Sequence, residues 1–120
     1  MSVISYNKRK GNYGEDVAEG YLTAKGYAII GRNYKRGAGE IDIIAKDGEY
    51  IVFVEVKYRK NLSAGLPREA VTKTKRRALT SAAKYYIMEN EIDDGVDMRF
   101  DVVEIVGAEQ LSIEHIINAF

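Results

Sequence analysis

The sequence contains no cysteine, which excludes both a disulfide framework and a thiolate metal site. It also contains no apolar run long enough to cross a membrane. The first ten residues, MSVISYNKRK, lack the apolar stretch of a signal peptide. We therefore expect a soluble cytoplasmic protein with no membrane partner. The 120 residues, 46% of them hydrophobic, are enough for one domain with a single core.

Net charge is also absent, because 18 Lys and Arg residues balance 18 Asp and Glu residues. The charges are unevenly distributed, however. Residues 57–84 contain nine bases and one acid, whereas residues 89–120 contain nine acids and one base. A basic middle segment is compatible with a surface that binds nucleic acid. A solvated helix face gives the same charge run, so charge alone leaves both interpretations open.

Hydrophobic periodicity and turn residues predict the order helix, three strands, helix, strand. We expect residues 1–11 to form a flexible arm and residues 12–120 to form a single domain. A loop is expected over residues 59–66, and Pro67 suits the first turn of a helix. Residues 112–120 fit either a short terminal helix or an edge segment. The order predicts an α/β fold, a mixed central sheet flanked by helices. The expected helices cover residues 12–25 and 72–88, and the expected strands cover residues 27–34, 40–46, 49–58 and 98–106.

Two charged residues interrupt the most hydrophobic of these strands, which reads VFVEVKYR over residues 52–59. Side chains two residues apart in a strand share a face, so Glu55 and Lys57 project to the same side. If that side is buried, each charge carries a desolvation cost of several kcal/mol. One interpretation is an ion pair on a half-exposed strand. The other is a functional site in which a further group offsets the cost.

A tight hairpin places two more acids on the same face. Asp47-Gly48 is typical of a two-residue hairpin loop, because both residues tolerate positive φ. With that loop, Asp42 pairs with Phe53 and Glu40 pairs with Glu55, and paired residues share a face. Asp42 and Glu55 then become diagonal neighbours, with Cβ atoms roughly 7 Å apart or less. Two carboxylates at that separation can bind one cation between them.

The chemistry of such a pair favours a divalent metal. Carboxylates this close repel each other and raise their own pKa values unless a cation lies between them. Oxygen ligands favour Mg²⁺ or Mn²⁺ over zinc, and a bound metal can lower the pKa of its water to give a hydroxide-like nucleophile. Lys57 could orient that water, help to deprotonate it, or stabilise charge on a phosphate. Glu15 could add a ligand from the first helix, although an acid in a first turn is also favoured by the helix dipole.

The residues quoted so far resemble the D…(D/E)-x-K signature of the PD-(D/E)XK nucleases, as GEIDIIA followed after a short turn by VFVEVK. The usual proline before the first aspartate is absent, and Glu40-Ile41 stands in its place. The helix start at Gly14-Glu15, Lys75, the strand RFDVV at residues 99–103 and the terminal NAF are similar to the YraN-like family, which is grouped with archaeal Holliday-junction resolvases. The resemblance covers nearly all of the chain beyond the first ten residues.

The resemblance implies a restriction-endonuclease-like αβββαβ core and a metal-dependent endonuclease that acts on DNA, with branched or junction DNA as the substrate class. It assigns catalysis to Asp42, Glu55 and Lys57. It assigns metal ligation to Asp42, Glu55, Glu15 and the carbonyl of Val56. Junction resolvases of this type act as dimers, so the resemblance also implies a homodimer. Fold analogy does not establish the activity.

Several other residues are candidates for the same site. Glu40 is expected to lie directly behind the metal ligands, unless a bulge turns it away. Lys75 begins the buried stripe of the second helix, where it could contact phosphate or extend toward solvent. Aromatic residues beside bases are typical of nucleic-acid surfaces. We expect DNA contacts from Lys35, Arg36 and Arg59, which lie beside tyrosines, and also from Lys75 and Arg76. A solvated position is the other interpretation of Arg76.

Two other function classes stay open on sequence alone. The first is a nucleic-acid-binding module that keeps the nuclease fold without cleaving. The second is an interaction protein whose basic middle segment meets an acidic protein. Affinity for DNA at low salt, where phosphate contacts are strongest, separates the second class from the others. His115, the single histidine, is far from the motif in sequence and is expected to be structural.

Overall fold

The computed structural model describes residues 13–60 and 71–120. The predicted order helix, three strands, helix, strand is confirmed, and residues 112–120 contribute an edge strand rather than a helix. The predicted arm, most of the predicted loop at 59–66, and Pro67 lie outside the described residues. No helix within the described ranges is long and apolar enough to cross a membrane. The elements are α2 (Tyr13–Ala24), β1 (Ala28–Arg36), β2 (Gly39–Asp47), β3 (Tyr50–Arg59), α3 (Lys73–Glu89), β4 (Met98–Gly107) and β5 (Leu111–Ile116).

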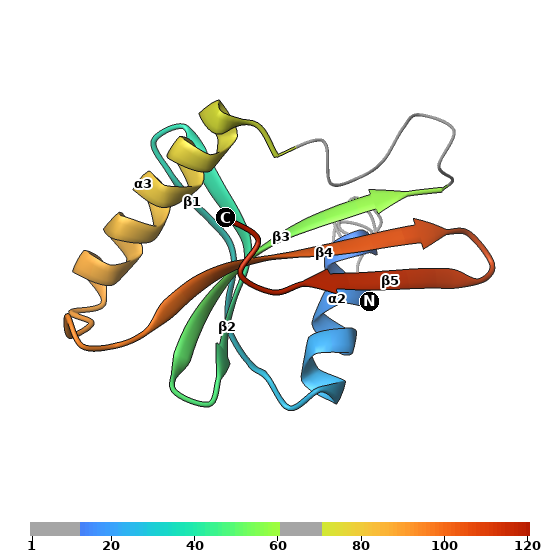
Figure 1. The fold of residues 1–120 in the computed structure, drawn as a ribbon, viewed down its shortest axis with the longest axis horizontal. Helices are drawn as coiled ribbons and strands as arrows, with labels where there is room; N and C mark the ends of the chain where they lie inside the picture. The colour runs from blue at the N-terminus through green and yellow to red at the C-terminus, as the bar shows by residue number, and fades with distance from the viewer. Residues whose placement is uncertain (1–12, 61–70) are drawn as a thin grey trace, which may run out of the picture.

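The strands form one mixed sheet, as the sequence predicts, and their order in the sheet is β1-β2-β3-β4-β5. β3 and β4 are parallel, and the three other pairs are antiparallel. α3 provides the crossover between the two parallel strands. The two helices pack on opposite faces of the sheet, as Figure 1 shows. This architecture is compatible with the αβββαβ core of the nuclease-like folds.

Each face of the sheet has its own hydrophobic layer. On one face, Ala18 and Leu22 of α2 pack against inward residues of β2, β3 and β4. On the other face, Leu79 and Ala82 of α3 pack against a layer that includes Phe53. All of these side chains are buried, so the alternation along each central strand supplies both cores. The sheet is consequently held between two helices and gives a rigid support for side chains at its ends.

A glycine sets how closely α3 approaches the sheet. A Cβ atom at Gly39 would lie 2.1 Å from the carbonyl oxygen of Ala78 and 3.2 Å from the Cβ of Ala82. No side chain larger than hydrogen fits there without moving the helix. Because Lys75 lies one turn before Ala78, this close contact also brings Lys75 to the ends of β2 and β3.

The predicted β2–β3 loop is wrong by one residue. The loop is Gly48-Glu49, and Asp47 still pairs with Tyr50 inside the ladder. Gly48 has φ of 59°, and positive φ at the first loop residue alone is the pattern of a type II′ turn. Asp47 remains in the strand, where its carboxylate accepts a hydrogen bond from Nη2 of Arg99 at 3.1 Å. That contact with β4 favours the observed turn over the predicted one.

The register of the hairpin shifts accordingly, and Asp42 stays close to Glu55. Phe53 pairs with Ile44 and not with Asp42, so the predicted pairings of Asp42 with Phe53 and of Glu40 with Glu55 are wrong. The shift is two residues, a full period of a strand, so the residues from Ile43 to Asp47 keep the faces that the prediction gave them. The alternation of β2 breaks at Asp42, because Ile41 packs in the α3 layer and Ile43 packs in the α2 layer. One step beyond the last ladder pair, Asp42 lies across from Glu55. The two carboxylates are therefore direct neighbours rather than diagonal ones.

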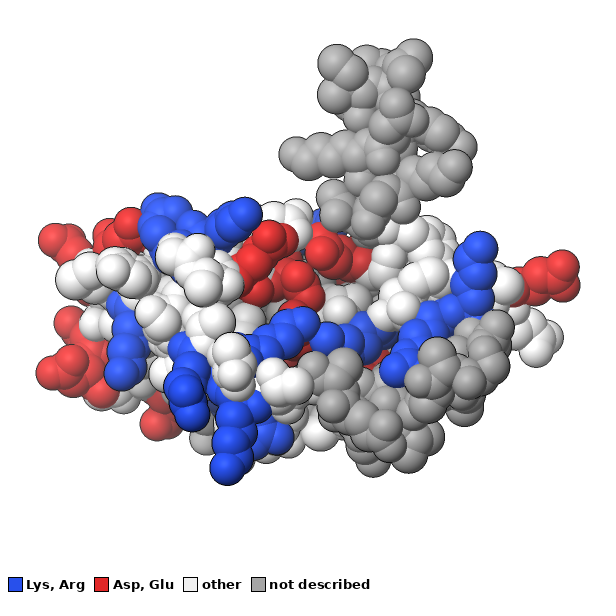
Figure 2. Space-filling model, turned by 90° about the horizontal axis from the view of Figure 1, so that it is seen from above, with Lys and Arg blue, Asp and Glu red and all other residues white. Residues whose placement is uncertain are grey.

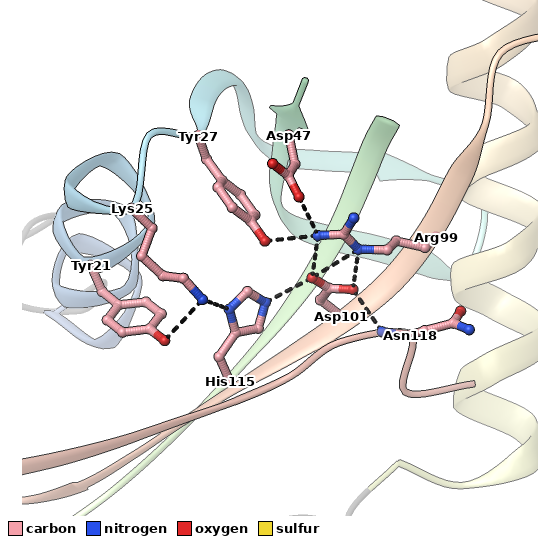
Figure 3. A network of polar contacts seen from close by, with 8 residues as sticks. All are labelled: Tyr21, Lys25, Tyr27, Asp47, Arg99, Asp101, His115 and Asn118. Atoms are coloured by element: carbon pink, nitrogen blue, oxygen red, sulfur yellow. Dashed lines mark hydrogen bonds and ion pairs between the residues drawn. The ribbon is translucent and has the colours of Figure 1, made fainter. Parts of the chain in front are cut away.

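A buried polar network connects the C-terminal segment to the hairpin and to the end of α2 (Figure 3). Asp101, with no exposed surface, accepts hydrogen bonds from Arg99, His115 and the backbone N–H of Asn118, at 3.0, 2.7 and 3.0 Å. Lys25 Nζ lies 3.1 Å from Nδ1 of His115. Because an ammonium only donates, Nδ1 accepts and Nε2–H donates to Asp101. His115 thus has a structural role in this network.

Candidate functional site

A pocket of about 360 Å³ opens where α3 begins and where β1 turns into β2. Viewed from this end of the molecule, acidic side chains gather in the middle of the face, with Lys and Arg side chains around them (Figure 2). The pocket is the place where most of the predicted site residues meet. Its lining includes Glu15, Glu40, Asp42, Glu55, Val56 and Lys75.

Asp42 and Glu55 form the centre of this pocket. The side chain of Glu55 is 4% exposed, and its carboxylate shares a hydrogen bond with that of Asp42. Oδ2 of Asp42 also accepts a hydrogen bond from the backbone N–H of Val56 at 2.8 Å. Burial and the neighbouring Glu55 carboxylate raise the pKa of Asp42 to about 8. At neutral pH the pair therefore holds one proton and one negative charge.

Two lysines balance the charge on Glu55. Nζ of Lys57 lies 3.2 Å from Oε2 of Glu55, and Nζ of Lys75 contacts the same oxygen. Burial pushes the pKa of Glu55 upward, but the Asp42 hydrogen bond and the Lys75 ammonium hold it below its usual value. Burial and the nearby Lys75 ammonium lower the pKa of Lys57. The desolvation cost of burying Glu55 is thus offset by Lys75 of α3 and Asp42 of β2, together with Lys57 of the same strand.

Glu15 and Glu40 also line the pocket, and the side chain of Asn33 contacts both of their carboxylates. Nδ2 of Asn33 donates to Oε1 of Glu15 at 2.8 Å and lies 3.5 Å from Oε1 of Glu40. Arg32 also donates to Glu15, at 3.3 Å. Glu15 is therefore oriented toward β1 in this conformation, at the edge of the pocket rather than at its centre. Its role as a metal ligand stays a prediction.

The sequence model of the uncharacterised protein family UPF0102 matches residues 14–105 of the chain. The chain belongs to this family. It is 47% identical over 114 residues to a UPF0102 protein of Clostridioides difficile (strain 630), an alignment that covers 95% of this chain and 98% of that protein. It is 48% identical to a UPF0102 protein of Caldicellulosiruptor saccharolyticus, covering 95% and 99% of the two chains. These names state no activity, so the YraN-like and nuclease resemblance stays a prediction.

The donor set of this UPF0102 protein fits a hard divalent cation. Among residues 13–60 and 71–120, no three His, Asp or Glu side chains are gathered closely enough to form a complete metal site. Asp42 and Glu55 nevertheless provide two contacting carboxyls. The buried Oε2 of Glu55 has no neutral hydrogen-bond donor among the described residues and is contacted by the ammonium groups of Lys57 and Lys75. Such a two-carboxylate site suits Mg²⁺ or Mn²⁺, which retain waters and take further oxygens from phosphate.

The other predicted DNA-contacting residues of the UPF0102 protein lie outside the pocket lining. Arg36 is paired with Glu89 at 3.0 Å and stacks over the ring of Tyr34, 4.8 Å from its centroid. Lys35 and Arg76 are exposed, and the Arg76 guanidinium also lies over the ring of Phe120. Arg59 ends β3 and is half-buried. Their contacts with DNA stay predictions.

Sequence reasoning missed Arg32, which organises the N-terminal end of α2. Its guanidinium donates to Asp16 and Glu19 at 3.0 Å and to Glu15 at 3.3 Å. The one available signal was three acids within five residues of the first helix, facing an arginine in the following strand. Arg32 keeps Glu15 beside the pocket and so positions this candidate ligand.

Proposed function

We propose that this protein is a divalent-metal-dependent endonuclease that cuts DNA, with branched or junction DNA as the preferred class. The observation that carries the proposal is the contact between the carboxyls of half-buried Asp42 and buried Glu55, which come from neighbouring strands. Lys57 adjoins them at 3.2 Å. Paired carboxylates with an adjacent lysine suit metal-assisted hydrolysis of a phosphodiester. The resemblance to the PD-(D/E)XK signature supports the same chemistry.

Asp42 and Glu55 would hold Mg²⁺ or Mn²⁺, with the carbonyl of Val56 as a further ligand. Glu15 would join them if it exchanged its contacts with Arg32 and Asn33 for the metal. A cation in this place would supply a Lewis acid for the phosphate and would lower the pKa of a bound water. Because ligand carboxyls must be deprotonated, binding would release the proton of Asp42.

Lys57 is the residue best placed to act on the attacking water. Its side chain is 16% exposed and its ammonium is held on Glu55, so it is oriented before substrate arrives. Burial lowers its pKa, which makes proton transfer near neutral pH easier. Lys35, Arg36, Arg59 and Arg76 would follow the DNA backbone. A homodimer would present two such sites to two strands.

A DNA-binding module without cleavage is the second candidate. It is favoured by the ammonium groups of Lys57 and Lys75, which already neutralise Glu55 in this structure. Such a module would bind junction DNA with strong salt dependence and would not cut it, whichever metal is supplied.

Cleavage of labelled junction, flap and linear duplex DNA separates the two candidates. We expect products with Mg²⁺ or Mn²⁺ and none with EDTA. Lys57→Ala should reduce the rate by about a hundredfold or more, the usual contribution of a positioned acid or base. Lys84→Ala, which removes an exposed lysine of α3, serves as the matched control and should cleave normally. Cleavage in EDTA, or at the full rate by Lys57→Ala, would overturn the proposed chemistry.

A further inference from the structure

We propose that Lys75 is a built-in counter-cation of Glu55. Its ammonium contacts the Glu55 carboxylate in the metal-free protein, and a divalent cation must displace this ammonium in order to bind. The inference rests on the proposed metal site. It adds a role for a residue of α3 that is separate from water activation by Lys57. The competition would make Lys75 a positioning residue that sets how tightly the pocket binds metal.

The first argument is the geometry of the contact. Lys57 and Lys75 approach the same oxygen, Oε2 of Glu55. Glu55 is 4% exposed and has little room to move, whereas the side chain of Lys75 is 40% exposed. A metal that takes Oε2 must replace an ammonium there, because two cations close together repel each other. Lys75 is the one that can leave toward solvent, since Lys57 is only 16% exposed.

The second argument is the place of Lys75 in its helix. Thr72 caps α3, and its hydroxyl accepts a hydrogen bond from the backbone N–H of Lys75 at 3.1 Å. In a capping box the residue at this third position is Glu or Gln, and acids are favoured there by the helix dipole. Here the position holds a lysine, and the first turn contains no acid. Glu55 supplies the anion that this end of α3 lacks.

The third argument is that the backbone position of Lys75 is fixed beside the pocket. The Thr72 cap holds the first turn, and the contact of Gly39 with Ala78 presses the helix onto β2. The Cα of Lys75 is therefore fixed at the pocket, while its ammonium can exchange partners. Once displaced, the ammonium remains at the pocket edge, where a phosphate oxygen would be an alternative anion.

Mn²⁺ binding to the full chain tests this role without any reliance on cleavage. We expect Lys75→Met to bind Mn²⁺ about tenfold more tightly than wild type, the value of one charge-assisted hydrogen bond. Lys73→Met makes the same charge change at an exposed position of the same helix. It should alter the Mn²⁺ affinity by about twofold or less at physiological salt, because exposed charges are screened. Free Mn²⁺ can be measured by electron paramagnetic resonance.

Lys75→Arg provides a second variant that retains the positive charge, and it should bind Mn²⁺ as weakly as wild type. Unchanged or weaker Mn²⁺ binding by Lys75→Met would overturn the inference and leave the metal site intact. Equal tightening by Lys73→Met or by Lys75→Arg would also overturn it, because the contact with Glu55 would not be the cause. If wild type and every variant failed to bind Mn²⁺, the proposed function would be overturned as well.

Discussion

Asp42→Asn is expected to abolish DNA cleavage while leaving the metal-free protein at least as stable as wild type at pH 7. The raised pKa of Asp42, about 8, keeps its carboxyl protonated at that pH. An asparagine can reproduce its hydrogen bonds: the amide N–H donates to Glu55, and Oδ1 accepts from Val56. It cannot become the anionic ligand that a metal needs. Cleavage should fall by about a thousandfold or more, because metal catalysis contributes several kcal/mol.

The pH dependence of this variant gives an independent check. The folded pKa of Asp42 lies above its ordinary value of 3.8, so its favourable contribution to stability is complete below pH 3.8 and is lost as pH rises to the folded pKa of about 8. As pH rises from 3.8 to about 8, the unfolded chain releases the Asp42 proton while metal-free folded wild type keeps it, so wild type should lose stability across this range and level off above it. Asp42→Asn has no such titration and should not show that loss. Thermal unfolding from pH 6 to pH 9.5 measures the difference.

The control for Asp42→Asn is Glu109→Gln, which removes an exposed carboxylate outside the pocket. This variant should cleave DNA and unfold like wild type. Full cleavage by Asp42→Asn would exclude Asp42 as a ligand. A fall of several degrees in its metal-free melting temperature at pH 7 would show that the wild-type carboxyl is ionised there.

Asp101→Ala is expected to give the largest loss of stability, about 3–5 kcal/mol in the free energy of unfolding. Asp101 has no exposed surface and is the anion for Arg99, whose side chain is 10% exposed. Its removal leaves that guanidinium buried without its main partner and takes the acceptor from His115 and Asn118. Urea unfolding of the two proteins at pH 7 measures the change.

Asp47→Ala is the matched control, because Asp47 pairs with the same guanidinium but is 44% exposed. We expect it to lose roughly 0–1 kcal/mol, the usual value of an exposed pair. Burial pushes the pKa of Asp101 upward, but His115, the Asn118 N–H and Arg99 hold it below 3.8. Its contribution is therefore complete above pH 3.8 and disappears as pH falls through the lower folded pKa. Equal losses for both variants at pH 7 would contradict the assigned role of Asp101.

The sequence predicts the fold well because most of its signals are local. Strand alternation and helical spacing depend on neighbouring residues, and Thr72 and Gly26 mark helix ends through their own backbone preferences. The β2–β3 loop was misplaced because Asp-Gly fits two different turns. The choice between them depends on Arg99, which is distant in sequence. The error is a full strand period, so the expectation that Asp42 and Glu55 lie close together survives it, and their carboxyls share a hydrogen bond.

The candidate site was predictable in its centre and less so around it. Asp42, Glu55 and Lys57 follow from parity along two adjacent strands. The hold of Arg32 on Glu15 requires knowing how α2 crosses β1, which no local pattern reveals. The contact of Lys75 with Glu55 depends equally on the close packing of α3 at Gly39. Helical spacing left the direction of Lys75 open between the sheet and solvent.

Crystals of the protein soaked in Mn²⁺ would reveal directly whether Asp42 and Glu55 share an ion. We expect an anomalous-scattering peak between the two carboxylates, with the Lys75 ammonium moved away from Glu55. Absence of a peak at this place in crystals that bind Mn²⁺ elsewhere would show that the paired carboxyls are not a metal site, and the nuclease interpretation would then fail.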